Sequence, residues 1–134
     1  MDQEMANRIV VEAQSGSRVL VLAHNLGEAR DYLAAIEAVA KRRFAQSIAS
    51  VRRANGAEAI NFTSNGYVKL MSGRSRGVRG VGADVVVVDA TVLTNDRAMR
   101  DVLPIVQTSR RAALWVISGP VDLDWMREKI SRWA

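Results

Sequence analysis

The hydrophobic and polar positions along the chain follow two periodicities, one typical of helices and one of buried strands. Apolar residues in 2–14 recur every three or four positions, which predicts an amphipathic helix that Ser15-Gly16-Ser17 ends. Residues 18–23, 85–89 and 112–117 are short and almost continuously apolar. This pattern is typical of strands that are covered on both faces, so Trp115 is expected in the core.

The segment between the first two of these strands predicts a long helix and then an antiparallel meander. Residues 48–53 and 58–63 flank Asn55-Gly56, a dipeptide that accepts the positive φ angles of a type I′ turn. Asn65-Gly66 repeats this signal before a third segment at 67–71. The helix is expected over 28–43, with inward positions at Ala29, Leu33, Ile36, Ala40 and Phe44.

Two further helices are expected in the last third of the chain. One begins at Thr94 or Asn95 and runs through Val106, with Pro104 stopping or kinking its last turn. The other spans about 123–133. Helices alternating with strands predict a three-layer α/β/α domain over residues 1–134, with a mainly parallel sheet plus the antiparallel meander.

Composition narrows the kinds of site that the chain can form. It has no cysteine, which excludes disulfides and thiolate metal sites, and its one histidine, His24, excludes a histidine-based zinc site within one chain. The N-terminus lacks an apolar signal core, and the longest apolar run is too short to cross a bilayer. We therefore expect a cytoplasmic protein with no metal, no cofactor and no membrane contact.

The net positive charge of the chain makes nucleic acid a candidate partner. Lys+Arg number 19 against 14 Asp+Glu, a formal net charge of +5, and only three of the cations are lysines. Arginine binds phosphate in a bidentate manner, so this bias suits contact with a polyanion. It equally suits a GC-rich genome, which prefers arginine codons whatever the function.

The strand at 85–89 ends on a carboxylate, Asp89, in the pattern of a Walker B strand. A buried parallel strand delivers such a carboxylate to the edge of the sheet where ligands bind in open α/β folds. The alternative is a strand-end aspartate that caps a turn.

The order of segments over residues 18–120 resembles the ATPase domain of the large terminase subunit of tailed phages, and more loosely the helicase-like P-loop ATPases. The resemblance rests on four motifs and covers about three-quarters of the chain. These are VLVLAHN at 19–25, EAINFTSNGYVKL at 58–70, RGVGAD at 79–84 leading into Asp89, and Ser118-Gly119 in the place of a coupling motif.

The resemblance implies a P-loop ATPase core, and the chain departs from that core in two ways. No Gly-x4-Gly-Lys-Ser/Thr occurs, and residues 2–14 match the helix that should follow that loop. Ala90 stands where the family has the glutamate that orients water. With the chain ending at Ala134, we also expect no nuclease domain and no catalytic residue. A P-loop supplied by another chain would restore nucleotide binding.

A glycine- and arginine-rich loop follows the meander. Arg74, Arg76 and Arg79 could wrap a DNA or RNA phosphate, helped by Arg52, Arg53, Arg110 and Arg111 if these share a face. The alternative is a solvated loop in which Arg79 pairs with Asp84 or Asp89.

The sequence also offers features that suit a protein partner. Trp125 and Trp133 lie about two turns apart on the last predicted helix, and they form either core or a surface for a partner. A sheet edge left bare by the missing first strand would be adhesive. These features favour a host or phage protein partner, or a homodimer. His24 is expected to be a structural residue, although in helicase-like relatives its loop touches DNA.

Overall fold

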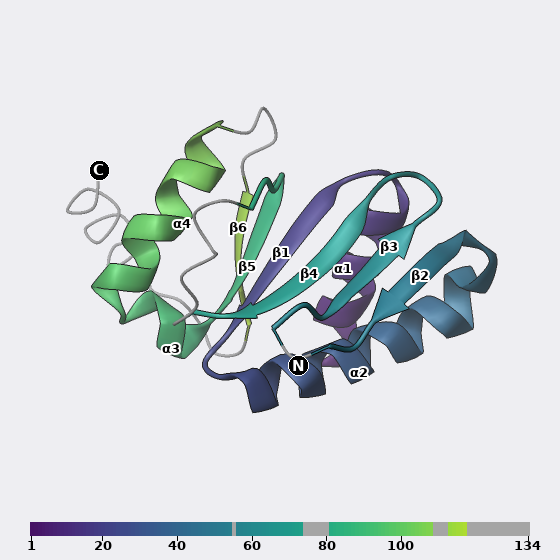
Figure 1. Ribbon diagram of the computed structural model, residues 1–134, viewed down its shortest axis with the longest axis horizontal. Helices are drawn as coiled ribbons and strands as arrows, with labels where there is room; N and C mark the ends of the chain where they lie inside the picture. Colours follow the sequence, from purple (N-terminus) through teal and green to yellow (C-terminus); the bar gives the residue numbers. More distant parts are fainter. Residues whose placement is uncertain (55, 74–80, 109–112, 118–134) are drawn as a thin grey trace.

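The structure is a computed structural model that describes residues 1–54, 56–73, 81–108 and 113–117 (Figure 1). The predicted helix at 123–133 lies outside these residues. The helical elements are α1 (Gln3–Gln14), α2 (Leu26–Phe44), the 3-10 turn η1 (Ala45–Ser47), α3 (Ala90–Leu93) and α4 (Asp96–Thr108). The strands are β1 (Arg18–Ala23), β2 (Ile48–Arg52), β3 (Ala59–Phe62), β4 (Tyr67–Ser72), β5 (Val85–Asp89) and β6 (Ala113–Ile117).

The described strands form one mixed sheet in the order β2-β3-β4-β1-β5-β6. β4, β1, β5 and β6 are parallel to one another, whereas β3 is antiparallel to both β2 and β4. The predicted combination of a mainly parallel sheet with an antiparallel meander is therefore confirmed. Because parallel strands share their direction, the carboxyl ends of β1, β4 and β5 meet at one edge of the sheet.

Side-chain caps set where the first two long helices begin. The Asp2 carboxylate accepts a hydrogen bond from the Met5 N–H at 2.8 Å, and the Asn25 side chain accepts one from the Glu28 N–H at 2.8 Å. Each cap satisfies one of the amides that a helix leaves unpaired in its first turn. Since Asn25 is the cap, α2 starts two residues before the predicted boundary.

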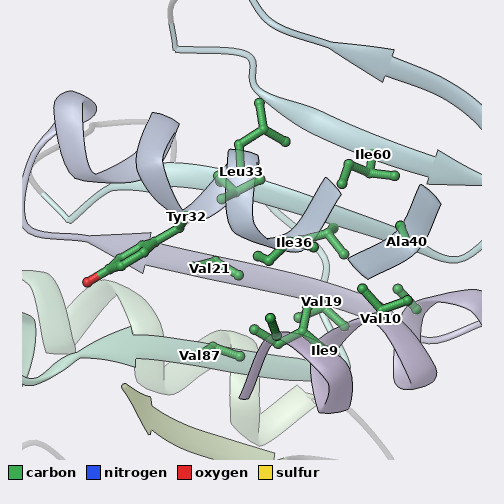
Figure 2. Packing of buried hydrophobic residues seen from close by; sticks show 14 of the residues in the cluster. Ile9, Val10, Val19, Val21, Tyr32, Leu33, Ile36, Ala40, Ile60 and Val87 are labelled. Atoms are coloured by element: carbon green, nitrogen blue, oxygen red, sulfur yellow. The ribbon is translucent and has the colours of Figure 1, made fainter. Parts of the chain in front are cut away.

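The helices cover the two faces of the sheet separately. On one face α1 and α2 pack against alternate residues of β1 and β5, among them Val19, Val21 and Val87 (Figure 2). On the other face α3 and α4 pack against the intervening residues Leu20 and Leu22. Both faces of β1 are buried, as its continuous apolar run predicts.

The helices of the second face cover only part of the sheet. Figure 1 shows α3 and α4 on the β5 side of the sheet, away from β2 and β3, and the residues that they bury come mainly from β1 and β5. Within the described residues, the helices are too short or too polar for any of them to span a membrane.

Two expectations need correction. α4 continues through Pro104 to Thr108, two residues beyond the predicted end at Val106, so Pro104 does not stop it, while the alternative of a kink stays untested. Pro104 is exposed, while Met99 and Val102 anchor the apolar side of α4 in the core, so packing outweighs the lost hydrogen bond. Trp115 is half-buried rather than core, and the Arg8 guanidinium lies 4.3 Å from its ring centroid.

Candidate functional site

Asp89 is a buried charged residue at the carboxyl edge of the sheet. It ends β5 and is only 6% exposed. Its Oδ1 accepts two hydrogen bonds from Thr91, from the backbone N–H at 2.9 Å and from the hydroxyl at 2.8 Å. Its Oδ2 accepts a hydrogen bond from the Tyr32 hydroxyl. Tyr32 comes from α2, 57 residues away in sequence, so the cluster joins two layers of the fold.

Hydrogen bonding keeps this buried carboxyl charged. Burial alone would raise the pKa of Asp89, but the donors on Tyr32 and Thr91 outweigh it and lower the pKa below the usual value. The partner responds in the opposite direction, since burial and the bond to Asp89 raise the pKa of Tyr32. Tyr32 is therefore a neutral donor to an ionised acceptor.

Besides Tyr32 and Thr91, the described surroundings of Asp89 include His24, whose positive charge also lowers the pKa of Asp89. Ala90 is the first residue of α3 and offers a methyl group next to Asp89, which itself caps that helix. Across the described ranges, no cluster of three histidine, aspartate or glutamate residues is arranged to hold a metal ion.

A polar hollow of about 600 Å³ lies at the same edge of the sheet. Its walls include His24, Gly73, Thr91 and Asn95. The His24 side chain is exposed, and its backbone N–H donates to the Glu28 carboxylate at 3.2 Å. Asn95 caps α4 by accepting from the Ala98 N–H at 3.1 Å. These contacts are those of helix caps and turns, and the His24 contact is made by its backbone, so the structural role expected for its side chain stays a prediction.

The open face of the meander forms a second candidate surface. Cross-strand pairing places Arg52, Ala59 and Lys69 in one row, and Ser50, Asn61 and Tyr67 in the next. Such neighbours share a face of the sheet. We name the residues of these two rows the meander face.

Contacts within the meander face leave cations at its surface. Asn61 donates to the Ser50 hydroxyl at 3.1 Å, and the Lys69 ammonium lies 4.7 Å from the Tyr67 ring centroid. Arg52 is exposed. A cavity of about 390 Å³ on this side is lined by Arg52, Asn61, Lys69 and also Val81, the first described residue after 74–80.

Comparison with solved structures identifies the fold. The chain superimposes on a crystal structure of the large terminase from a thermophilic bacteriophage with a TM-score of 0.68 and 17% sequence identity. The chain has a terminase-like fold. The match covers 93% of this chain but 34% of the terminase, so the chain spans about a third of that protein's length. Neither a protein-family model nor a curated protein sequence matches it.

The terminase-like fold brings only some of the predicted site residues together. Arg52 lies on the meander face, but Arg53 turns away to α2, where its Nη2 donates to the Glu37 Oε2 at 2.6 Å. Asp84, one of two partners suggested for Arg79, is paired with Arg18 at 3.1 Å. The remaining predicted residues lie outside the described ranges, namely Arg74, Arg76, Arg79, Arg110, Arg111, Ser118, Gly119, Trp125 and Trp133.

Sequence reasoning missed several buried polar residues, among them Tyr32 and Glu58. Tyr32 lies on the inward side of α2 beside Leu33, and its helical spacing from Ala29 and Ile36 could have revealed it. Its hydroxyl would then have required a buried partner. Glu58 is 1% exposed with Arg30 at 3.8 Å, and among the described residues neither of its carboxylate oxygens has a hydrogen-bond partner. No periodic signal marked Glu58, because it directly precedes a strand.

Proposed function

We propose that this terminase-like domain binds nucleic acid through the meander face and the adjoining arginine loop at 74–80, and does not itself hydrolyse ATP. The observation that carries the proposal is the position of Val81. It lines the same cavity as Arg52 and Lys69, so the loop rejoins the described chain beside two cations.

The chemistry of the meander face suits a phosphate backbone. Arg52 offers a planar, permanently charged donor, Lys69 offers an ammonium, and Asn61 offers an amide. Tyr67 adds an aromatic ring next to the lysine, and such rings can stack on bases. Among the described residues, α3 and α4 pack mainly over β1 and β5, so no described helix covers this face.

Two features support the absence of hydrolysis by these 134 residues. The sequence contains no Gly-x4-Gly-Lys-Ser/Thr to hold phosphates. Ala90 cannot orient a water molecule as a carboxylate would. Both positioning and electrostatic stabilisation, the main sources of phosphoryl-transfer catalysis, would therefore have to come from elsewhere.

Fluorescence anisotropy with a mixed-sequence DNA oligonucleotide tests the binding. We expect affinity to fall steeply with salt, because each phosphate contact releases counterions. Arg52→Glu should weaken binding by about tenfold and flatten the salt dependence. Arg42→Glu is the matched control, since Arg42 is an exposed arginine on α2, which packs on the opposite face of the sheet.

Equal weakening by both variants would show only a general effect of net charge and would contradict the proposal. If the triple variant Arg74→Ala, Arg76→Ala, Arg79→Ala binds DNA like the wild type, residues 74–80 do not contribute to binding and that part of the proposal is wrong. Phosphate release from ATP that Asp89→Ala abolishes would overturn the non-hydrolytic part.

A protein-interaction role is the second candidate, and the edge strand β6 favours it. The first four residues of β6 are apolar and half-buried, and Trp115 lines a groove of about 510 Å³ with Arg8 and Val11 of α1. Val11 is one of two large apolar residues that are exposed in the described chain. An apolar edge of this kind suits pairing with a second copy or with another protein.

A further inference from the structure

The carboxylate of Asp89 is enclosed by donors from the protein itself. A carboxylate oxygen accepts about two hydrogen bonds. Oδ1 uses both on Thr91, and Oδ2 uses one on the Tyr32 hydroxyl. Only 6% of Asp89 and 7% of Tyr32 is exposed, so the hydrogen bond between them is buried.

This arrangement does not fit the magnesium ion that a Walker B aspartate implies. Mg²⁺ requires near-octahedral oxygen ligands at about 2.0–2.1 Å and keeps several waters when it binds a protein. Such an ion would need an accessible lone pair on Asp89 and room for its waters. Here the saturated Oδ1 caps α3, the Tyr32 hydroxyl takes one of the two acceptor positions of Oδ2, and Asp89 is only 6% exposed, which leaves little access for a hydrated ion.

We propose that Tyr32 takes the place of a cation at Asp89, so that the Tyr32–Asp89–Thr91 cluster links α2 to the β5–α3 junction instead of binding metal. This deepens the non-hydrolytic part of the proposed function and does not depend on nucleic-acid binding. Tyr32 is the positioning residue, because its hydroxyl reaches Asp89 from another layer of the fold.

The geometry of Tyr32 explains why it holds this position. Its ring packs in the core formed by Val21, Leu33 and Ile36, and Figure 2 shows its hydroxyl directed out of that cluster. A side chain held by packing loses little further conformational entropy when its hydroxyl donates. A hydrogen bond to an ionised acceptor is also among the stronger ones in proteins.

Manganese, as a paramagnetic substitute for magnesium, tests the proposal by NMR. In the wild-type chain, we expect the amide signals of Ala90 and Thr91 to stay sharp at Mn²⁺ concentrations that broaden signals near exposed carboxylates distant from Asp89. In Tyr32→Phe, the freed Oδ2 should bind Mn²⁺ and the same two signals should broaden. In the double variant Tyr32→Phe, Asp89→Asn, the two amide signals should be sharp again, because the carboxylate that would bind Mn²⁺ is gone.

Tyr67→Phe is the matched control, because the Tyr67 hydroxyl donates to the Gly82 carbonyl and not to Asp89. It should respond to Mn²⁺ like the wild type. Tyr32→Phe should also lower Tm by roughly 5 °C through loss of the link.

Two results would overturn the inference. One is broadening of Ala90 and Thr91 in the wild type, a measurement that needs no folded variant. The other is a folded Tyr32→Phe chain in which these signals stay sharp. DNA-binding anisotropy on the same wild-type sample tests the proposed nucleic-acid binding separately. A chain that does not bind DNA would still give the Mn²⁺ results expected here, because neither result depends on DNA.

Discussion

At the scale of single residues, Gly66 shows that a glycine in a turn can be required by close packing instead of by its backbone conformation. The positive φ of its turn belongs to Asn65, at 72°, and Gly66 itself has no positive φ. A Cβ at Gly66 would lie 1.8 Å from the Ala13 carbonyl oxygen and 2.9 Å from that of Ser17. Gly66 is therefore required by the close approach of β4 to the end of α1.

Gly66→Ala should destabilise the fold by about 3 kcal/mol, because backbone would have to move to admit the methyl group. Chemical denaturation with urea measures the change. Gly56→Ala is the control, since Gly56 has a φ of 78° but no atom within 4 Å of its Cβ position. Its cost should be only that of the left-handed backbone, about 1 kcal/mol. Equal losses in the two variants would argue against the steric explanation.

At the scale of elements, a buried carboxylate ties α2 to the end of β2. Glu37 is 6% exposed and accepts from Arg53 at 2.6 Å, and the Lys41 ammonium lies 2.6 Å from the same oxygen. The hydrogen bond from Arg53 lowers the pKa of Glu37 to about 2, with a smaller contribution from Lys41 against the opposing effect of burial. The Glu37–Arg53 ion pair thereby fixes the end of β2, the outer strand of the meander, to α2.

This link predicts a loss of stability in acid. A carboxyl whose pKa is depressed on folding stabilises the folded state above its unfolded pKa, here about 4.5, and loses that effect as pH falls towards 2. Glu37→Gln should cost about 1 kcal/mol at neutral pH, since the exposed cations are screened by solvent. The urea midpoints of the wild type and of Glu37→Gln should converge as the pH approaches 2. A constant difference from neutral pH down to that point would contradict the assignment.

At the scale of the whole molecule, the two edges of the described sheet differ in protection. β2 carries Ser50 and Arg52 outward and has a bulge after Ile48, features that discourage pairing with another sheet. β6 is apolar along its whole length. Within the part of the chain that the structure describes, the sheet thus has one protected edge at β2 and one apolar edge at β6 that suits association.

Sedimentation equilibrium tests association at this edge. If a second copy pairs there, Val11→Lys should weaken the dimer by about tenfold or more, because the charge would be desolvated beside Trp115. Leu26→Lys is the control, since Leu26 is 41% exposed against 40% for Val11 but lies on α2. A monomer at every concentration, or equal effects of the two variants, would remove the dimer from consideration.

Much of the fold could be predicted because short periodic runs carry their own signal. The strands at 18–23 and 85–89 and the first two helices lie where the apolar spacing places them. The exceptions were positions where packing overrides local preference. Pro104 remains inside α4, and Trp115 lies near an edge that no pattern could identify.

The sequence alone determined most of the described helices and strands, the mixed character of the sheet and the strand-end position of Asp89, since these depend on neighbours a few residues apart. Tertiary structure alone decided the strand order, the Tyr32–Asp89 bond, the Glu37–Arg53 pair and which face of the meander stays open. Each of these joins residues from separate elements, and local periodicity carries no information about which distant surfaces meet. Packing decides that, because burying one arrangement of apolar faces fixes which polar groups are enclosed together and which remain in water.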